Sequence, residues 1–207
     1  MALRVIAGEY RGRVLRAVPG QGTRPLLGQV REAIFNILGA WVEGREVWDL
    51  FAGTGASGIE ALSRGARRVL FVEKSNQALR VLRENLHGLG EGALVRTHVV
   101  RADAWDPPPM TPQGEAGEVP PELVFLDPPY AMVAEDPVRS VVRATRLARR
   151  MAPGGVLVFH FQEGHLDRDD FPGDVQVELR RWGASAVAFL EVPGATTSGV
   201  VDESRGA

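Results

Sequence analysis

Apolar and polar positions follow two different periods along this chain, and together they predict strands followed by helices. Short apolar runs typical of buried strands occur at residues 46–51, 68–73 and 94–101. Apolar residues at helical spacing occupy 56–65 and 75–88, and Ser75 stands where an N-cap is expected. This alternation predicts a parallel sheet with helices on both of its faces.

The segments on either side extend this pattern. Residues 1–20 turn at Gly8 and Gly12 and predict a β-hairpin or a pair of short strands, and 26–40 predicts a helix. After the apolar run 123–126 we expect a basic helix near 135–151, a strand at 156–161 and an antiparallel edge pair at 175–181 and 184–191. The composition predicts a loop or lid at 105–121, and 193–207 has no packing pattern and predicts a disordered tail.

Composition narrows the class of protein. The 207 residues suffice for one domain with a sizeable core, and 44% of them are hydrophobic. The chain has no long apolar run and no apolar signal region near Met1, so we expect a cytoplasmic protein that does not enter a membrane. It has no cysteine, and its four histidines lack the spacing of metal ligands, so we expect no disulfide and no metal.

Charge is unevenly distributed, although the net charge is only −2. Residues 1–31 contain one acidic side chain, Glu9, and six arginines: Arg4, Arg11, Arg13, Arg16, Arg24 and Arg31. A local basic arm on a nearly neutral chain predicts phosphate contacts beside an active site. The alternative is a general use of arginine in place of lysine, since Lys74 is the only lysine.

The most informative residues are Asp127-Pro128-Pro129-Tyr130, which directly follow an apolar run. The two prolines stiffen the turn and lack N–H groups, which leaves carbonyls available to accept hydrogen bonds. The Asp127 carboxylate is a second acceptor, and the Tyr130 ring offers a flat surface for a base. The turn is therefore suited to binding a planar amine, whereas an isolated Pro-Pro pair is more often an ordinary turn.

A second motif supports the functional interpretation. An apolar strand runs through Asp49 into a turn with glycines at 53, 55 and 58, and Glu73 closes the next strand. This spacing satisfies the dinucleotide fingerprint, in which an acidic residue binds ribose hydroxyls. Asp49 is placed to receive an ammonium group. Its carboxylate would repel a pyrophosphate, which disfavours a nicotinamide cofactor. Asp49, Glu73, Asp103 and Asp127 each end or closely follow an apolar run, which predicts one acidic rim.

In order and spacing these motifs resemble those of the S-adenosylmethionine-dependent amino methyltransferases. The segments 4–15, 23–25, 30–36 and 182–190 narrow the resemblance to the bacterial 16S ribosomal RNA (guanine-N2-)-methyltransferases, and it extends over residues 3–191. The chain departs from that family's pattern at 26–29, where threonine and aspartate are replaced by Leu26-Leu27-Gly28-Gln29. The roles that residues at these four positions have in the family are therefore not expected here.

The resemblance implies a Rossmann-like class I methyltransferase fold: α/β, with a doubly wound, mostly parallel sheet, an antiparallel edge pair and an N-terminal β-hairpin extension. It implies S-adenosyl-L-methionine as cofactor, bound by Asp49, Phe51, Ala52, Gly53, Thr54, Gly55, Glu73, Lys74, Asp103 and Ala104. The implied catalytic residues are Asp127, Pro128 and Tyr130, with Tyr130 stacking on a flipped guanine. The arm residues expected to contact RNA are Arg4, Tyr10, Arg11, Arg13, Arg24 and Arg31.

The expected organisation is an RNA-facing extension at 1–40, a methyltransferase domain at 41–192 and a tail at 193–207. The expected partner of this monomer is ribosomal RNA, either free or within an assembled or assembling small subunit. A DNA adenine-N6 or cytosine-N4 methyltransferase is the main alternative, but the chain lacks a sizeable target-recognition domain. A non-catalytic, methyltransferase-like RNA-binding protein is a third, and it would require the loss of one of the motif acids.

Overall fold

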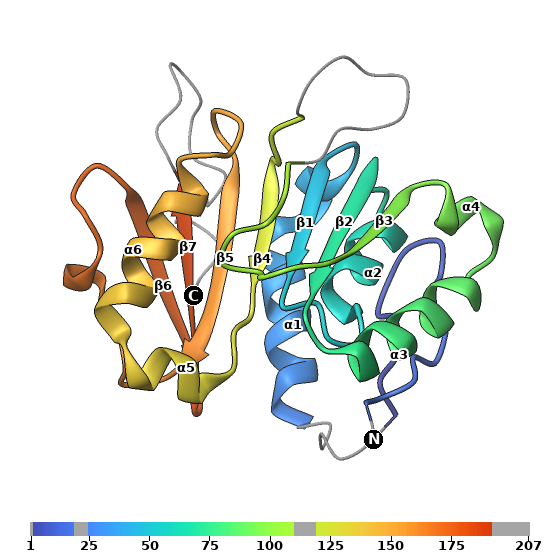
Figure 1. Cartoon of the computed structure of the whole chain (residues 1–207), viewed down its shortest axis with the longest axis horizontal. Helices are drawn as coiled ribbons and strands as arrows, with labels where there is room; N and C mark the ends of the chain where they lie inside the picture. The colour runs from blue at the N-terminus through green and yellow to red at the C-terminus, as the bar shows by residue number, and fades with distance from the viewer. Residues whose placement is uncertain (1, 19–24, 110–118, 192–207) are drawn as a thin grey trace.

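The computed structural model describes residues 2–18, 25–109 and 119–191. The predicted tail, Arg24 and the centre of the predicted 105–121 loop lie outside these residues. A mostly parallel sheet forms the centre of the fold (Figure 1), and in the described part its strand order is β3-β2-β1-β4-β5-β7-β6. The strands are β1 (Glu46–Leu50), β2 (Arg68–Glu73), β3 (Thr97–Arg101), β4 (Leu123–Leu126), β5 (Val156–Gln162), β6 (Gln176–Trp182) and β7 (Ser185–Glu191).

The strand directions confirm the predicted topology. Strands β1 to β5 pair in parallel with their neighbours, whereas β7 runs antiparallel to both β5 and β6. The helices are α1 (Pro25–Leu38), α2 (Ala56–Ser63), α3 (Asn76–His87), α4 (Glu91–Leu94), α5 (Tyr130–Glu135) and α6 (Pro137–Ala148), with 3₁₀ turns η1 (Gly39–Val42) and η2 (Arg168–Asp170). None of the helices in the described part has the length and apolar content needed to cross a membrane.

Helices cover both faces of the sheet, as expected for a parallel sheet whose strands are apolar throughout. On one face Val47 and Phe125 belong to the same core cluster as residues of α1, α2 and α3. On the other face Trp48 and Leu50 pack in a second cluster with residues of α6. Neighbouring residues of β1 thus face opposite layers, and the sheet is held rigidly between them.

Two predicted boundaries were wrong for identifiable reasons. The strand expected at 94–101 is shorter, because the short helix α4 precedes β3. The basic helix expected at 135–151 is α6, which is shorter than predicted, and a separate short helix, α5, precedes it. Asp136 separates them, and its side chain accepts the N–H of Arg139 as the N-cap of α6. Pro137 occupies the first turn of α6, where a proline is well tolerated.

The N-terminal extension is the hairpin-like pair that the sequence predicts, held by backbone hydrogen bonds between its two halves. Its described residues pair through an isolated antiparallel bridge, Arg4 with Val14, and form no strand of the sheet. It is instead fastened to α2, where the buried Glu60 carboxylate accepts two successive backbone N–H groups of the extension, at 2.7 and 3.0 Å. Gly8 has a positive φ, and a Cβ atom there would lie 1.8 Å from the carbonyl oxygen of Ser63. The extension therefore depends on close backbone packing against α2 as well as on its own antiparallel hydrogen bonds.

Candidate active site

Acidic residues gather at the edge of the sheet where the parallel strands end. Asp49 lies near the end of β1, Glu73 ends β2, and Asp127 directly follows β4. The order of strands reverses between β1 and β4, so Asp49 and Asp127 flank the topological switch point at which open α/β sheets bind ligands. The charges of Asp127 and Glu73 both raise the pKa of Asp49. Asp103 follows β3, farther from the switch point.

The loop after β1 has a backbone that few residues can adopt. Phe51 has a φ of 59° and is the only non-glycine residue with positive φ in the described part of the chain. Such conformations are concentrated at binding and catalytic sites. Gly55 has a φ of 80°, and a Cβ atom there would lie 2.3 Å from the Leu82 side chain. Asp49 Oδ2 accepts the Gly58 N–H at 2.8 Å and so ties β1 to the first turn of α2.

Three backbone N–H groups hold the Glu73 carboxylate in place. Oε2 accepts the Gly53 N–H at 2.9 Å, and Oε1 accepts the N–H groups of Lys74 and Ser75, each at 2.7 Å. A carboxylate has about four acceptor positions, so one remains for a further donor. The arrangement leaves a place for a ribose hydroxyl and links the glycine-rich loop directly to the end of β2.

The Asp49 carboxyl is 3% exposed, and its protonation is perturbed. The pKa of Asp49 is raised to about 8, mainly by burial and also by the nearby charges of Asp127 and Glu73, although the hydrogen bond from Gly58 and the charge of Arg31 act to lower it. A cation placed beside the group would favour its ionised form. This buried carboxyl is therefore compatible with the ammonium group of S-adenosylmethionine.

The segment after β3 provides a polar group beside an apolar surface. Asp103 is exposed, and its Oδ1 accepts the Trp105 N–H at 3.0 Å. Ala104 and Trp105 are buried, and the Trp105 ring meets the Phe51 ring edge-on, with centroids 5.5 Å apart. These groups fit an adenine, whose ring is flat and apolar and whose amine donates hydrogen bonds.

The Asp127-Pro-Pro-Tyr turn is held by a partner that sequence reasoning missed. The Asp127 side chain is 49% exposed, and its Oδ1 lies 2.8 Å from Nδ1 of His160. Pro128 is buried, and α5 begins at Tyr130, whose hydroxyl lies 2.9 Å from His160 Nε2 and 2.9 Å from Ser185 Oγ. The available signal was a histidine within the otherwise apolar run 156–161, but no local pattern points to Ser185.

Asn85 was also missed by sequence reasoning. It is buried on α3, where its Nδ2 donates to the Thr54 carbonyl at 2.9 Å and its Oδ1 accepts the Arg16 N–H at 2.7 Å. It thereby connects the N-terminal extension to the glycine-rich loop. Of the other predicted cofactor contacts, Ala52 is buried and the Lys74 side chain is exposed.

The predicted RNA-contacting residues are divided by the fold. Arg11 and Arg13 are exposed, and within the described residues neither side chain has a hydrogen-bond or ionic partner. Arg4 is exposed as well, although its Nη1 donates to the Gly12 carbonyl at 3.0 Å. These three arginines remain available to a phosphate, whereas Arg24 lies outside the described residues.

Two of the predicted RNA contacts, Tyr10 and Arg31, are buried. Tyr10 is 7% exposed in the core beneath the extension, and its hydroxyl accepts a hydrogen bond from Arg96 at 2.8 Å. Arg31 is 8% exposed, and its Nη2 donates to the Arg4 carbonyl at 2.7 Å. Both side chains make hydrogen bonds within the protein, because the extension folds back over them. Neither presents a surface to RNA.

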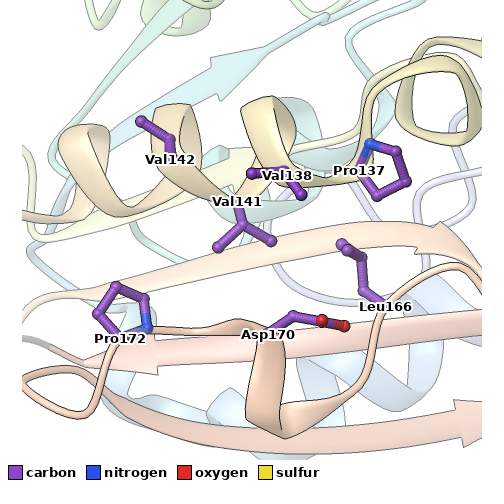
Figure 2. A pocket seen from close by; sticks show the side chains of 7 residues that line it. All are labelled: Pro137, Val138, Val141, Val142, Leu166, Asp170 and Pro172. Atoms are coloured by element: carbon purple, nitrogen blue, oxygen red, sulfur yellow. The ribbon is translucent and has the colours of Figure 1, made fainter.

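A separate cavity of about 140 Å³ lies beside α6 (Figure 2). None of the residues that the sequence motifs single out borders it. It is lined by Pro137, Val138, Val141, Val142, Leu166, Asp170 and Pro172.

Comparisons with known proteins agree with this geometry. Residues 3–191 match the family described as conserved hypothetical protein 95. The Bacillus subtilis protein named "Putative rRNA methyltransferase YlbH" is 41% identical over 193 residues, which cover 93% of this chain and 100% of that protein. The Haemophilus influenzae protein named "Ribosomal RNA small subunit methyltransferase D" is 35% identical over 131 residues. That match covers 62% of this chain and 64% of the relative, so the chain spans slightly less than two thirds of the relative's length.

A solved structure from Escherichia coli extends the likeness to three dimensions. It is described as "Putative methyltransferase yhhF", has a TM-score of 0.72 and 26% identity, and covers 94% of this chain and 100% of that one. The chain belongs to the family described as conserved hypothetical protein 95, and its fold is that of the class I methyltransferases.

Proposed function

We propose that this protein is an S-adenosylmethionine-dependent rRNA methyltransferase that modifies the exocyclic N2 amine of a guanine in small-subunit ribosomal RNA. The observation that carries the proposal is the Asp127-Pro-Pro-Tyr turn, fixed by His160 at the switch point of a methyltransferase fold. The names of the relatives support ribosomal RNA as substrate. The guanine N2 position rests on the resemblance in sequence and on the chemistry of the turn.

The proposed cofactor contacts follow the edge of the sheet. Glu73 would hold the ribose through its remaining acceptor position, Asp49 and Gly53 would hold the amino-acid part, and Asp103 with Ala104 the adenine. The glycine-rich loop would approach the cofactor through its backbone, and Gly55 lets this loop pack closely against the Leu82 side chain of α3. When bound, S-adenosylmethionine supplies a methyl group on a sulfonium centre, whose bonding electrons return to sulfur as nitrogen forms the new bond.

The residues of the turn would make the guanine amine a better nucleophile. The lone pair of this amine is delocalised into the ring, and hydrogen bonds from its two hydrogens to Asp127 and the Pro128 carbonyl would favour a pyramidal nitrogen. Asp127 then accepts the proton that nitrogen loses after transfer. Its exposed side chain can pass that proton to solvent. Most of the rate enhancement comes from proximity and alignment, with Tyr130 stacked on the base.

The N-terminal extension, residues 1–40, would bind the RNA backbone through Arg4, Arg11 and Arg13. These arginines are exposed at the end of the chain that precedes the methyltransferase domain, residues 41–192. The substrate would be either free RNA or an assembling small subunit. Because ribosomal RNA is the proposed substrate, the proposed site of action is the cytoplasm. We also propose that the active form is a monomer.

The test is methylation of 16S RNA and of small-subunit particles from a strain lacking this gene, followed by mass spectrometry of the nucleosides. We expect N2-methylguanosine, and in Asp127→Asn a rate lower by about 10² or more with unchanged cofactor affinity. Asp106→Asn, at an exposed site near the edge, is the matched control. A product in DNA, or a methylated nucleoside other than N2-methylguanosine, would refute the proposal.

A further inference from the structure

Four side chains form a continuous hydrogen-bonded series behind the proposed active site. Ser185 Oγ is 2.9 Å from Tyr130 Oη, which is 2.9 Å from His160 Nε2, and His160 Nδ1 is 2.8 Å from Asp127 Oδ1. The four residues come from the start of β7, the start of α5, β5 and the end of β4. We refer to them as the Ser-Tyr-His-Asp series.

The series runs from the interior of the protein to its surface. Ser185 is buried and His160 is 5% exposed, whereas the Asp127 side chain is half exposed. The Tyr130 ring meets the imidazole edge-on, with centroids 5.4 Å apart, so hydrogen bonds and ring packing hold the same pair. Buried polar groups normally have hydrogen-bond partners, and both imidazole nitrogens of His160 have one here.

The direction of each hydrogen bond follows by elimination. An ionised Asp127 carboxylate only accepts hydrogen bonds, so the proton of a neutral imidazole must lie on Nδ1. Nε2 is then an acceptor and takes the single hydroxyl hydrogen of Tyr130. The hydroxyl of Ser185 must in turn donate to Tyr130 Oη. Asp127 therefore selects the His160 tautomer, and the hydroxyls of Tyr130 and Ser185 complete a series that is compatible with it.

We propose that His160 is a positioning residue for the methyl transfer: its Nδ1–H fixes Asp127 Oδ1, which leaves Oδ2 directed to the substrate amine. This inference rests on the proposed function. In the described residues no hydrogen-bond donor reaches Oδ2. An exposed aspartate without His160 would sample several rotamers, and only some would accept the amine hydrogen. The Tyr130 hydroxyl is committed to His160 and Ser185, so Tyr130 would act through its ring.

The series also gives the antiparallel edge a function. Ser185 is the first residue of β7 and pairs with Gln162 at the end of β5. The β6–β7 pair therefore brings a hydroxyl to the edge of the sheet where the parallel strands end. Shortening β7 by one residue would remove the group that orients Tyr130.

Two substitutions distinguish the effects of the two hydrogen bonds of His160, because each of them places a nitrogen near the position of one imidazole nitrogen. The Asn side-chain nitrogen is attached to Cγ, as Nδ1 is, so His160→Asn can still donate to Asp127. The Gln nitrogen lies one bond farther out, like Nε2, so His160→Gln can reach Tyr130 but not Asp127. We expect His160→Gln and His160→Ala to lower kcat about 10- to 100-fold. His160→Asn should recover most of that loss, and cofactor Kd should be unchanged in all three.

The control is His98→Ala, at an exposed position of β3. A direct readout without substrate is the imidazole Nδ1 proton in an NMR spectrum of the ¹⁵N-labelled protein. It should be protected from exchange in the wild type and become exchangeable in Asp127→Ala. Equal kcat in His160→Asn and His160→Gln, or an Nδ1 without a proton, would overturn the proposal. A wild type that forms no N2-methylguanosine would instead count against the proposed function, and the NMR result would still test the series.

Discussion

The buried Asp49 carboxyl makes the stability of this protein depend on pH in an unusual direction. Its pKa is about 8 in the folded protein, against an ordinary value of 3.8. Between these values the folded state holds one more proton than the unfolded state, so raising the pH favours unfolding. The contribution of Asp49 is fully present below pH 3.8 and is lost as pH rises toward 8.

The size of the effect follows from linkage. One proton difference changes the free energy of unfolding by about 1.4 kcal/mol per pH unit, or about 2.7 kcal/mol between pH 5 and pH 7. Asp49→Asn keeps an oxygen that can accept the Gly58 N–H, but it does not titrate. Urea unfolding at constant ionic strength should therefore show a loss of stability over this range in the wild type that the variant lacks.

Asp106→Asn serves as the control, because Asp106 is exposed and should leave the pH dependence unchanged. Equal slopes in the wild type and Asp49→Asn would refute the argument. A second assay tests the proposed ammonium contact: at pH 7 a group with a pKa of 8 is about 0.9 protonated. If the cofactor's ammonium lies beside Asp49, binding should release that proton, measured by calorimetry in buffers of different ionisation enthalpy. No release would exclude the contact.

Three further predictions concern cofactor binding, RNA binding and the extension. Glu73→Gln should weaken S-adenosylmethionine binding by about 1–3 kcal/mol, measured by calorimetry, because a charged acceptor is lost. Arg11→Ala with Arg13→Ala should weaken RNA binding and flatten the dependence of log affinity on log salt by about 0.7 per lost contact. Gly8→Ala should destabilise the protein by about 1–3 kcal/mol more than Gly12→Ala in urea unfolding, because only Gly8 is crowded.

Each of these predictions has an outcome that contradicts it. Unchanged cofactor affinity in a folded Glu73→Gln would remove Glu73 from the site. A wild-type salt dependence in the double arginine variant would place the RNA elsewhere, with the basic residues of α6 as the next candidate. Equal stability of Gly8→Ala and Gly12→Ala would contradict the close contact of the extension with α2, since both glycines have positive φ.

The sequence determined the features that depend on neighbouring residues. The apolar runs predicted the parallel strands closely, because a strand buried on both faces must be apolar throughout. Ser75 was correctly predicted as an N-cap, since capping involves a side chain and a backbone N–H three residues apart. The acidic residues at the ends of those runs were expected on one edge, since parallel strands end together.

Only the tertiary structure decided which polar side chains are buried and which hydrogen-bond partners they have. Tyr10 and Arg31 belong to a basic arm by sequence, yet both are buried by the fold of that arm. His160 approaches Asp127 from 33 residues away, and Tyr130 meets Ser185 across 55 residues. Contacts over such separations leave no periodic signal in the chain: a polar residue in an apolar run indicates that it is buried, but not which group it binds. The choice of partner is made by the order of strands, which brings β4, β5 and β7 side by side.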